Sequence, residues 1–457
     1  MNDSYIKTLS VDYLISIFDE HLALKNTVGV DGVSVEYFAS NLAKETEIIH
    51  RKVSNQNYDF SLYKEKLILK DRYSCPRVIA IPTIRDKVVV KALHIYLNET
   101  LNVDVSISSA HTHIKSIKKT LIDEKHLNGF IRIDIKNFFP SINHQVLMTK
   151  LKNNLNSDCA LKLIEKCISQ TTVSRNDKNR EKYQNKQGIP QGLAISGLLA
   201  DFYLQDIDKR FQQNVQIKYY RFVDDILILC RKEEIKAIRS DLIQQINKLG
   251  LTTHKEGHNS EKSSSGAIID GIDYLGYVFQ GNKISVRKSS VEKLYSRLGR
   301  IFAKYTAEGE QDLERLYYKV NLAISGCFFD EKKIGWLCYF KYMNNITLLY
   351  RLDKYVINLF KRFNVPLKKN KLKRFVRSYW EVQKGMESKY LPKFSKDKSS
   401  VDLITSHTKI TRKQKLTRIH SDIVSLEGYL HKDNSKLEIK SLKELMDILG
   451  DAQPYYN

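Results

Sequence analysis

The sequence predicts an α+β protein with more than one domain. Its 457 residues suffice for about two to four domains of roughly 100–200 residues each. Short apolar runs bounded by turn residues, at 130–140 and 217–230, are typical of buried strands. From about residue 285 onward, apolar side chains recur at helical spacing among lysines and arginines. Strands in the centre and helices towards the end therefore indicate a mixed fold.

The first part of the chain is predicted to hold helices and then strands. Residues 1 to about 50 are expected to be helical, with a break at the glycine-containing stretch 26–34. Residues 60–90 contain basic, strand-like segments. Residues 130–140 are predicted to form one strand that its final proline ends.

The second part alternates the two kinds of element. A helix is predicted at 192–213, after the turn "QGIPQG", and two short strands around a tight turn at 217–230. The stretch 273–279 reads as a further strand. A later helix places one apolar face towards a core, formed by Leu352, Tyr355, Val356, Leu359, Phe360 and Phe363.

The charge of the chain indicates a polyanionic partner. Lysine and arginine number 75 against 52 aspartates and glutamates, so the formal net charge is 75 − 52 = +23. Such an excess favours nucleic acid over an anionic membrane surface as the partner. Between residues 361 and 377 there are eight basic residues and no acidic one, which predicts a surface that follows phosphates. Positive charge that serves only solubility is the alternative.

The cysteines and the N-terminus predict a soluble protein of the cytoplasm. None of the six cysteines forms a CxxC pair or a Cys/His cluster, so a zinc site is not expected and the thiols are predicted to be free. The N-terminus lacks the layout of a signal peptide. No apolar run approaches the ~18 residues of a membrane-spanning helix.

Three aspartates stand in otherwise apolar strand segments. Asp224 and Asp225 are adjacent within "YYRFVDDILILC", and Asp134 lies within "IRIDIKNFF". Because an ionised carboxylate enters apolar surroundings only at a large cost, the doublet is predicted to sit at a hairpin tip. Three converging carboxylates repel one another unless cations lie between them. We therefore expect metal, rather than a salt bridge, to neutralise them: two Mg²⁺ ions about 3.5–4 Å apart, suited to phosphoryl transfer.

The order of these segments resembles the motifs of reverse transcriptases. "RIDIKNFFPSI", "QGIPQGLAISGLLADFYL", "YYRFVDDILI", "EKSSSG" and "DYLGYVF" follow one another as in that family, and "CPRVIAIPTIRDKVVVKAL" resembles its fingers motif. The resemblance is to the bacterial branch that includes group II intron enzymes and phage-defence reverse transcriptases. It covers about residues 25–300 and continues weakly into "GWLCYFKY".

The resemblance implies a right-hand polymerase with fingers, palm and thumb. Residues 1–129 would form an N-terminal extension and the fingers, and residues 130–283 the palm, with a fingers insertion around 150–187. Residues 284–385 would form a helical thumb, and residues 386–457 a basic helical C-terminal extension.

By the same resemblance, Asp134 and Asp224 would bind two Mg²⁺ ions, for which Mn²⁺ could substitute, and Asp225 would assist. The backbone carbonyl of Ile135 would be a further ligand. Lys262 would be the general acid for the departing pyrophosphate, with Lys255 as the alternative.

The remaining implied roles concern the nucleotide and the primer. Arg77 would meet the triphosphate, and Gln191 would bond to the nucleotide or template. Phe139 would exclude a 2′-hydroxyl and so select deoxynucleotides; packing in the core is the alternative for one of Phe138 and Phe139. The primer grip would be formed by Tyr274, Leu275, Gly276 and Tyr277. An ordinary hairpin strand is the alternative for this stretch.

The expected activity is RNA-directed DNA synthesis from dNTPs, with a structured noncoding RNA as template and a DNA primer and product. Phe222 replaces the usual tyrosine before the aspartate doublet. No retron motif and no HNH-like endonuclease module is recognisable, which favours a role in antiphage defence. The alternatives are a group II intron-like enzyme in retrotransposition or repair, and a catalytically silent RNA-binding protein. Template identity, priming mode, untemplated synthesis and a homo-oligomeric state are left open.

Overall fold

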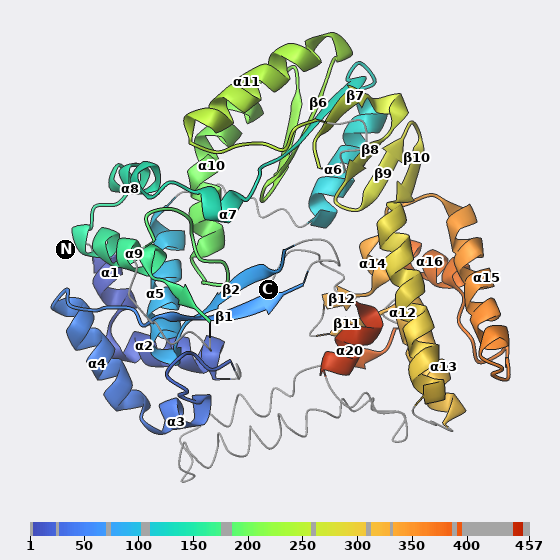
Figure 1. The fold of residues 1–457 in the computed structure, drawn as a ribbon. Coiled ribbons are helices and arrows are strands. Elements are labelled where there is room, and N and C mark those ends of the chain that lie inside the picture. The colour runs from blue at the N-terminus through green and yellow to red at the C-terminus, as the bar shows by residue number, and fades with distance from the viewer. Residues whose placement is uncertain are drawn as a thin grey trace. The chain divides into compact units, whose positions relative to one another are not determined.

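A computed structural model describes residues 3–23, 27–69, 75–101, 110–174, 185–256, 262–307, 312–329, 332–385, 391–394 and 442–450. The chain forms two compact units. Unit 1 holds residues 1–108 and 125–266, and unit 2 holds residues 109–124 and most of the chain from 267 onward. Helices and strands occur in both units, which confirms the predicted α+β class (Figure 1). No helix among the described residues is long and apolar enough to cross a membrane.

Unit 1 begins with helices, as predicted. They are α1 (Asp3–Thr8), α2 (Val11–Ile17), the π-helix η1 (Phe18–Leu22), α3 (Val35–Ser40), α4 (Leu42–Ser54) and α5 (Ile84–Thr100). The side chain of Ser34 caps α3 by accepting from the backbone N–H of Tyr37. Thr83 caps α5 in the same way through Asp86. This cap ends the predicted strand-like stretch 60–90, because the backbone turns helical at Ile84.

A small sheet in unit 1 has the strand order β2-β1-β4. Its strands are β1 (Tyr63–Ile68), β2 (Arg77–Ile81) and β4 (Thr172–Val173). β1 and β2 are antiparallel, with Ile68 opposite Arg77, and β4 runs parallel to β1. Two helices, α8 (His144–Lys152) and α9 (Asp158–Ser169), precede β4.

The central sheet of unit 1 has the order β5-β6-β3-β7. Its strands are β3 (Gly129–Asp134), β5 (Lys218–Phe222), β6 (Asp225–Cys230) and β7 (Ser264–Ala267). From Ile226 to Cys230, β6 is fully buried. Two helices lie against this sheet: α10 (Ser196–Gln212) contacts β5, and α11 (Ile235–Lys248), preceded by η2 (Lys232–Glu234), contacts β3 (Figure 1). The predicted hairpin at 217–230 is thereby confirmed.

The predicted strand at 130–140 is shorter than expected. β3 ends at Asp134, and Asn137 takes a left-handed backbone with φ 48°. Residues Phe138–Ser141 then form the short helix α7, which contains the proline that was expected to end the strand. The left-handed asparagine, which tolerates this conformation better than most residues, is the physical cause of the change of direction.

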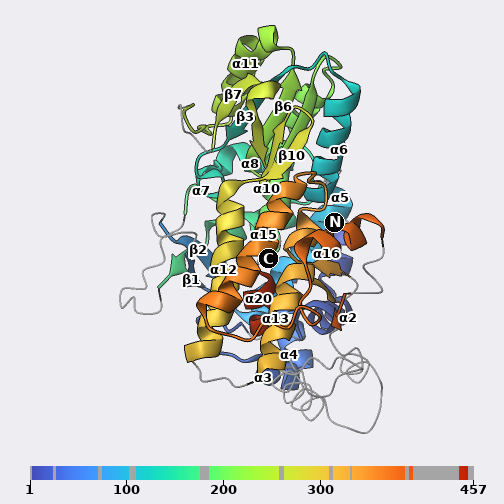
Figure 2. The ribbon, with the colours of Figure 1, turned by 90° about the vertical axis from the view of Figure 1, so that its right-hand side faces the viewer.

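Unit 2 combines two small sheets with a helical bundle. The first sheet has the order β10-β9-β8 and the second the order β12-β11-β13. α12, α13 and α15 run side by side (Figure 2). The elements are α6 (Ala110–Asp123), η3 (Ile268–Asp270), β8 (Ile272–Tyr274), β9 (Tyr277–Gln280), β10 (Lys283–Val286), α12 (Lys288–Ala307), α13 (Leu313–Ser325), β11 (Cys327–Phe329), β12 (Lys332–Ile334), α14 (Trp336–Tyr339), α15 (Ile346–Arg362), α16 (Phe375–Gln383), β13 (Lys393–Phe394) and α20 (Leu442–Leu449).

The stretch 273–279, predicted as one strand, is a hairpin. Leu275 and Gly276 have φ of 49° and 81° and separate β8 from β9. Positive φ at both central residues is typical of the two-residue turn that suits the twist of antiparallel strands. The predicted apolar face of α15 is buried at Leu352 and Val356, with Leu359 and Phe360 beside them.

The two units divide the chain differently from the predicted domains. The break at 266/267 lies inside the segment predicted as palm, and α6 belongs to unit 2 although the sequence places it with the fingers. The names fingers, palm and thumb for individual segments stay predictions. Most of the predicted C-terminal extension, 386–457, lies outside the described residues.

Candidate active site

The three aspartates meet at one end of the central sheet of unit 1. In the antiparallel pairing of β3 with β6, Asp134 lies directly opposite Asp225. The backbone N–H of Ile135 donates to the carbonyl oxygen of Asp224 at 3.0 Å. The sheet register therefore brings together three carboxylates from two distant parts of the chain, as the sequence predicts.

The turn that carries Asp224 is strained. Phe222 pairs with Asp225, so Val223 and Asp224 form a two-residue connection between β5 and β6. Val223 has φ 60°, in the left-handed region. A β-branched residue rarely adopts this conformation, and such strain costs about 1–3 kcal/mol. Surrounding contacts must therefore hold the turn in place.

Arg221 supplies such a contact. Its guanidinium donates to the carbonyl oxygen of Val223 at 2.9 Å, to Asp201 at 2.9 Å and to Asp208 at 2.6 and 2.7 Å. Both aspartates belong to α10. Burial raises the pKa of Asp201 above its usual value, and the nearby Arg221 offsets part of that increase. The Arg221 guanidinium therefore connects the hairpin tip to α10, the helix beside the sheet.

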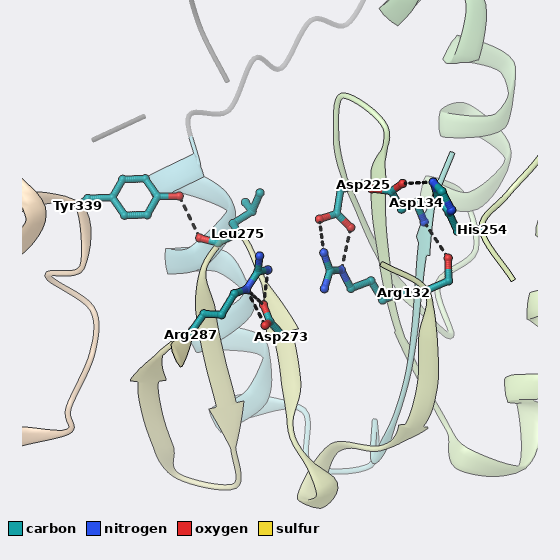
Figure 3. A network of polar contacts seen from close by, with 9 residues as sticks. Arg132, Asp134, Asp225, His254, Asp273, Leu275, Arg287 and Tyr339 are labelled. Atoms are coloured by element: carbon teal, nitrogen blue, oxygen red, sulfur yellow. Dashed lines mark hydrogen bonds and ion pairs between the residues drawn. The ribbon is translucent and has the colours of Figure 1, made fainter. Parts of the chain in front are cut away.

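Asp225 has a salt bridge that the sequence analysis did not anticipate. Arg132 donates from Nε to Oδ1 and from Nη2 to Oδ2, each at 2.9 Å (Figure 3). The arginine side chain is 6% exposed. The expectation that metal rather than a salt bridge compensates the doublet is therefore wrong for Asp225. Its predicted part in metal binding stays a prediction.

His254 lies beside Asp134 and was missed by the sequence analysis. Its Nε2 is 3.3 Å from Asp134 Oδ1 (Figure 3) and 3.0 Å from the Nζ of Lys262. Its backbone N–H donates to the carbonyl oxygen of Asp134, and the Asp134 N–H donates to Ser263. Lys262 is thus joined to Asp134 through one imidazole, while Lys255 is exposed. No motif signals His254, because the contact depends on the isolated β-bridge between Ile135 and Thr253.

The donor set suits a hard divalent cation. Asp134 and Asp224 offer carboxylate oxygens at one sheet end, and Ile135 offers a carbonyl oxygen there; Mg²⁺ prefers such ligands. Within the described ranges, no group of three or more His, Cys, Asp or Glu side chains is arranged to hold a metal. The orientation of Asp225 towards Arg132 agrees with that finding. Metal binding by Asp134, Asp224 and the Ile135 carbonyl stays a prediction.

The loop around Gln191 lies against β2, the strand that begins with Arg77. The carbonyl oxygen of Gln191 accepts from the N–H of Ala80 at 2.7 Å. Gly192 has φ +104°, and a Cβ there would stand 2.7 Å from the Cγ2 of Ile79. Only glycine fits this approach. The structure thereby joins the Gln191 loop to the strand of Arg77, at a residue three positions further along that strand.

Phe139 is joined to the same loop. Its carbonyl oxygen accepts from the N–H of Ile189 at 2.9 Å. Phe138 is buried, whereas Phe139 is half-buried. Their different places on the short helix α7 account for this difference in burial. One phenylalanine is therefore core and the other is partly open.

The predicted primer-grip residues form the β8–β9 hairpin of unit 2. Tyr274 and Tyr277 are buried, and burial raises the pKa of the Tyr277 phenol. The hydroxyl of Tyr339 donates to the carbonyl oxygen of Leu275 at 2.9 Å, which fixes the turn (Figure 3). Leu275 is buried as well, and the carbonyl oxygen of Gly276 accepts from the N–H of Arg287 at 2.8 Å. The primer-grip role of this hairpin stays a prediction.

The sequence of residues 68–279 matches the family described as reverse transcriptase (RNA-dependent DNA polymerase). All the residues predicted for the site, from Arg77 to Tyr277, lie inside this stretch. Divalent metal ions are used throughout this family, and its members copy RNA into DNA.

Individual proteins are also similar to parts of this chain. Protein YkfC of Escherichia coli K12 is 22% identical over 299 residues, which cover 55% of this chain and 75% of YkfC. The group II intron-encoded protein LtrA of Lactococcus lactis is 30% identical over 153 residues, which cover 32% of this chain but only 24% of LtrA. Apo telomerase from Candida tropicalis superposes with a TM-score of 0.40 at 14% identity, over 75% of this chain and 67% of the telomerase.

Five ordered motifs, the meeting of three aspartates at one sheet end and the match over residues 68–279 agree with one another. They also agree with the right-hand polymerase class that the resemblance implied. Residues 68–279 thus match the reverse transcriptases, which are RNA-directed DNA polymerases, and part of the chain is similar to a protein encoded by a group II intron.

Proposed function

We propose that this protein copies a structured noncoding RNA into DNA by adding dNTPs to a primer, with two Mg²⁺ ions held at Asp134 and Asp224. The observation that carries the proposal is the register of β3 with the hairpin, which sets Asp134 opposite Asp225 and bonds Ile135 to Asp224. Bound Mg²⁺ would supply the charge that neutralises the phosphate oxygens during transfer.

The side chains around the aspartates have distinct proposed tasks. The fork of Arg77 would bind triphosphate oxygens, and the Gln191 loop, bonded to the same strand, would place the nucleotide base. Phe139 would reject a 2′-hydroxyl by its bulk. Lys262, held at His254, would give a proton to the departing pyrophosphate. Positioning and charge neutralisation supply most of the catalysis in such transfers.

We further propose that the protein acts in antiphage defence in the bacterial cytoplasm. The similarity to LtrA, a group II intron-encoded protein, favours one second candidate, which is retrotransposition or repair. Sequencing the RNA that copurifies with the protein from its host separates the two. A single abundant noncoding species supports a dedicated template in defence, whereas intron RNA supports the second candidate.

Primer extension on poly(rA)/oligo(dT) tests the chemistry. The wild type is expected to extend the primer, and Asp224→Asn to give no product. Asp206→Asn is the matched control, because Asp206 lies on α10 with its side chain 73% exposed and forms an ion pair with Lys150 on α8. Equal extension by Asp224→Asn and the wild type would remove Asp224 from the mechanism. A wild type that binds RNA without extending any primer would instead support a silent RNA-binding protein.

A further inference from the structure

Arg132 and Asp225 form a pair inside the candidate active site. Arg132 stands two residues before Asp134 on β3, so both side chains lie on one face of the sheet. The register sets Asp134 opposite Asp225 and Arg132 opposite Leu227. Arg132 therefore reaches Asp225 across a diagonal of the strand pair, a distance that a long side chain spans.

The geometry of the pair is bidentate. Each of the two Asp225 oxygens accepts one N–H of the guanidinium at 2.9 Å. The exposed fractions of the side chains are 6% for the arginine and 15% for the aspartate. Parallel charge-assisted bonds of this kind are the strongest that arginine makes with a carboxylate, and burial shields them from salt.

We propose that Arg132 is a positioning residue that withholds Asp225 from the metal ions and fixes the hairpin tip. Asp134 and Asp224 are then the two carboxylates that hold the ions, with the Ile135 carbonyl beside them. The inference rests on the proposed metal site, and it assigns different tasks to the two adjacent aspartates of the doublet.

The alternative is that Asp225 is itself a ligand. Each Asp225 oxygen keeps a second lone pair while it accepts from Arg132. An ion on that lone pair would lie close to the buried guanidinium, whose positive charge repels it. Turning the carboxylate fully to the ion would break the fork and leave the guanidinium partly uncompensated, which is strongly unfavourable. The Arg132–Asp225 pair is electrically neutral. It therefore attracts the carboxylates of Asp134 and Asp224 less than an unpaired Arg132 would, and repels them less than an unpaired Asp225 would.

Mn²⁺ binding to the full-length protein, followed by electron paramagnetic resonance without nucleic acid, tests the inference. Asp134→Asn is expected to weaken binding by about tenfold or more, as loss of a ligand does. Arg132→Met is expected to tighten it by about tenfold, because Asp225 is released and one positive charge is lost. Because the loss of a positive charge alone also favours the bound cation, the charge-neutral double variant Arg132→Met/Asp225→Asn separates the two effects.

The double variant Arg132→Met/Asp225→Asn decides the matter even if Arg132→Met fails to fold. Replacing both members of a buried pair is tolerated far better than removing one. If Asp225 is not a ligand, the double variant binds Mn²⁺ within about twofold of the wild type. If its binding falls about tenfold, as in Asp134→Asn, Asp225 is a ligand and the inference is overturned.

Arg210 provides the matched control. It forms a fork with Asp241 on α10 and α11, with its side chain 57% exposed, so Arg210→Met removes an arginine–aspartate pair away from the hairpin. It should leave Mn²⁺ binding unchanged. Wild-type binding in Asp134→Asn would overturn the proposed metal site and the inference together, whereas a weakened Asp134→Asn with a weakened double variant overturns the inference alone.

Discussion

Arg221 is the contact that holds the strained turn before Asp224, and replacing it with methionine should destabilise unit 1. The substitution keeps most of the side-chain volume and removes the positive charge. Asp201 and Asp208 on α10 then face each other without the guanidinium that joins them. The carbonyl oxygen of Val223 loses its donor as well.

The expected magnitude follows from burial. Removing one partner of a buried ion pair costs about 3–5 kcal/mol, because the other charge stays behind. Arg221 and Asp208 are 10% and 15% exposed, but Asp201 is 23% exposed, which places the loss at the lower end, ~3 kcal/mol. For a unit of this size, a loss of that kind lowers Tm by about 6–12 °C.

The loss should depend on pH in a definite direction. Burial raises the pKa of Asp201, so the folded protein holds a proton there more tightly than the unfolded chain. Protonation therefore stabilises the fold; this contribution is complete below the unfolded pKa and disappears as the pH rises through the folded pKa. In the wild type Arg221 lowers the pKa of Asp201, so removing Arg221 increases the stabilisation that protonation of Asp201 provides. Acidification from neutral pH towards the folded pKa of Asp201 should restore part of the stability of Arg221→Met.

Thermal unfolding followed by calorimetry at several pH values measures both effects. Arg210→Met serves again as the control, because its exposed pair should cost about 0–1 kcal/mol and show no recovery in acid. If Arg221→Met melted like Arg210→Met, or if acid failed to narrow the gap between them, the reasoning about this buried pair would be refuted. Primer extension by Arg221→Met should also fall, since the turn carrying Asp224 is released.

Three other outcomes are expected. Phe139→Ala should raise ribonucleotide incorporation about tenfold relative to dNTPs, measured as the ratio of kcat/KM values; an unchanged ratio would remove the steric role. In thermal unfolding, Gly192→Ala should lose about 1–3 kcal/mol of stability, because its Cβ would stand 2.8 Å from the Ala80 oxygen, and primer extension should fall as well. The control Gly197→Ala, whose Cβ would meet nothing within 4 Å, should keep the stability of the wild type in the same experiment. Tyr339→Phe should lower the stability of unit 2 by about 1 kcal/mol in denaturant titrations, through the bond to Leu275; no change would show that this hydroxyl is compensated by water.

Much of this site could be predicted from local sequence. Asp134 and the doublet stand out because carboxylates interrupt apolar strand patterns, and the short spacing of the 217–230 segment predicts the hairpin. Both features depend on residues close together in the chain. The order of the motifs then adds the family. The roles given to these aspartates remain predictions that the variants above test.

Local conformation was predicted less well where a single backbone angle decides it. The stretch 273–279 reads as a continuous strand, yet Leu275 adopts a positive φ and divides it. Nothing about leucine indicates that conformation, which neighbouring contacts such as the Tyr339 bond hold in place. Asn137 has the same effect after β3, where a helix follows instead of more strand.

The sequence by itself determined which segments carry charge into the sheet, because strand patterns and motif spacing are properties of neighbouring residues. Only the tertiary structure decided the partners of those charges. Arg132 meets Asp225 through the register of two strands, and His254 meets Asp134 through the segment that pairs beside β3. Such contacts join residues 93 and 120 positions apart (225 − 132 and 254 − 134). Their geometry follows from the pairing of whole strands, which no single stretch of sequence specifies.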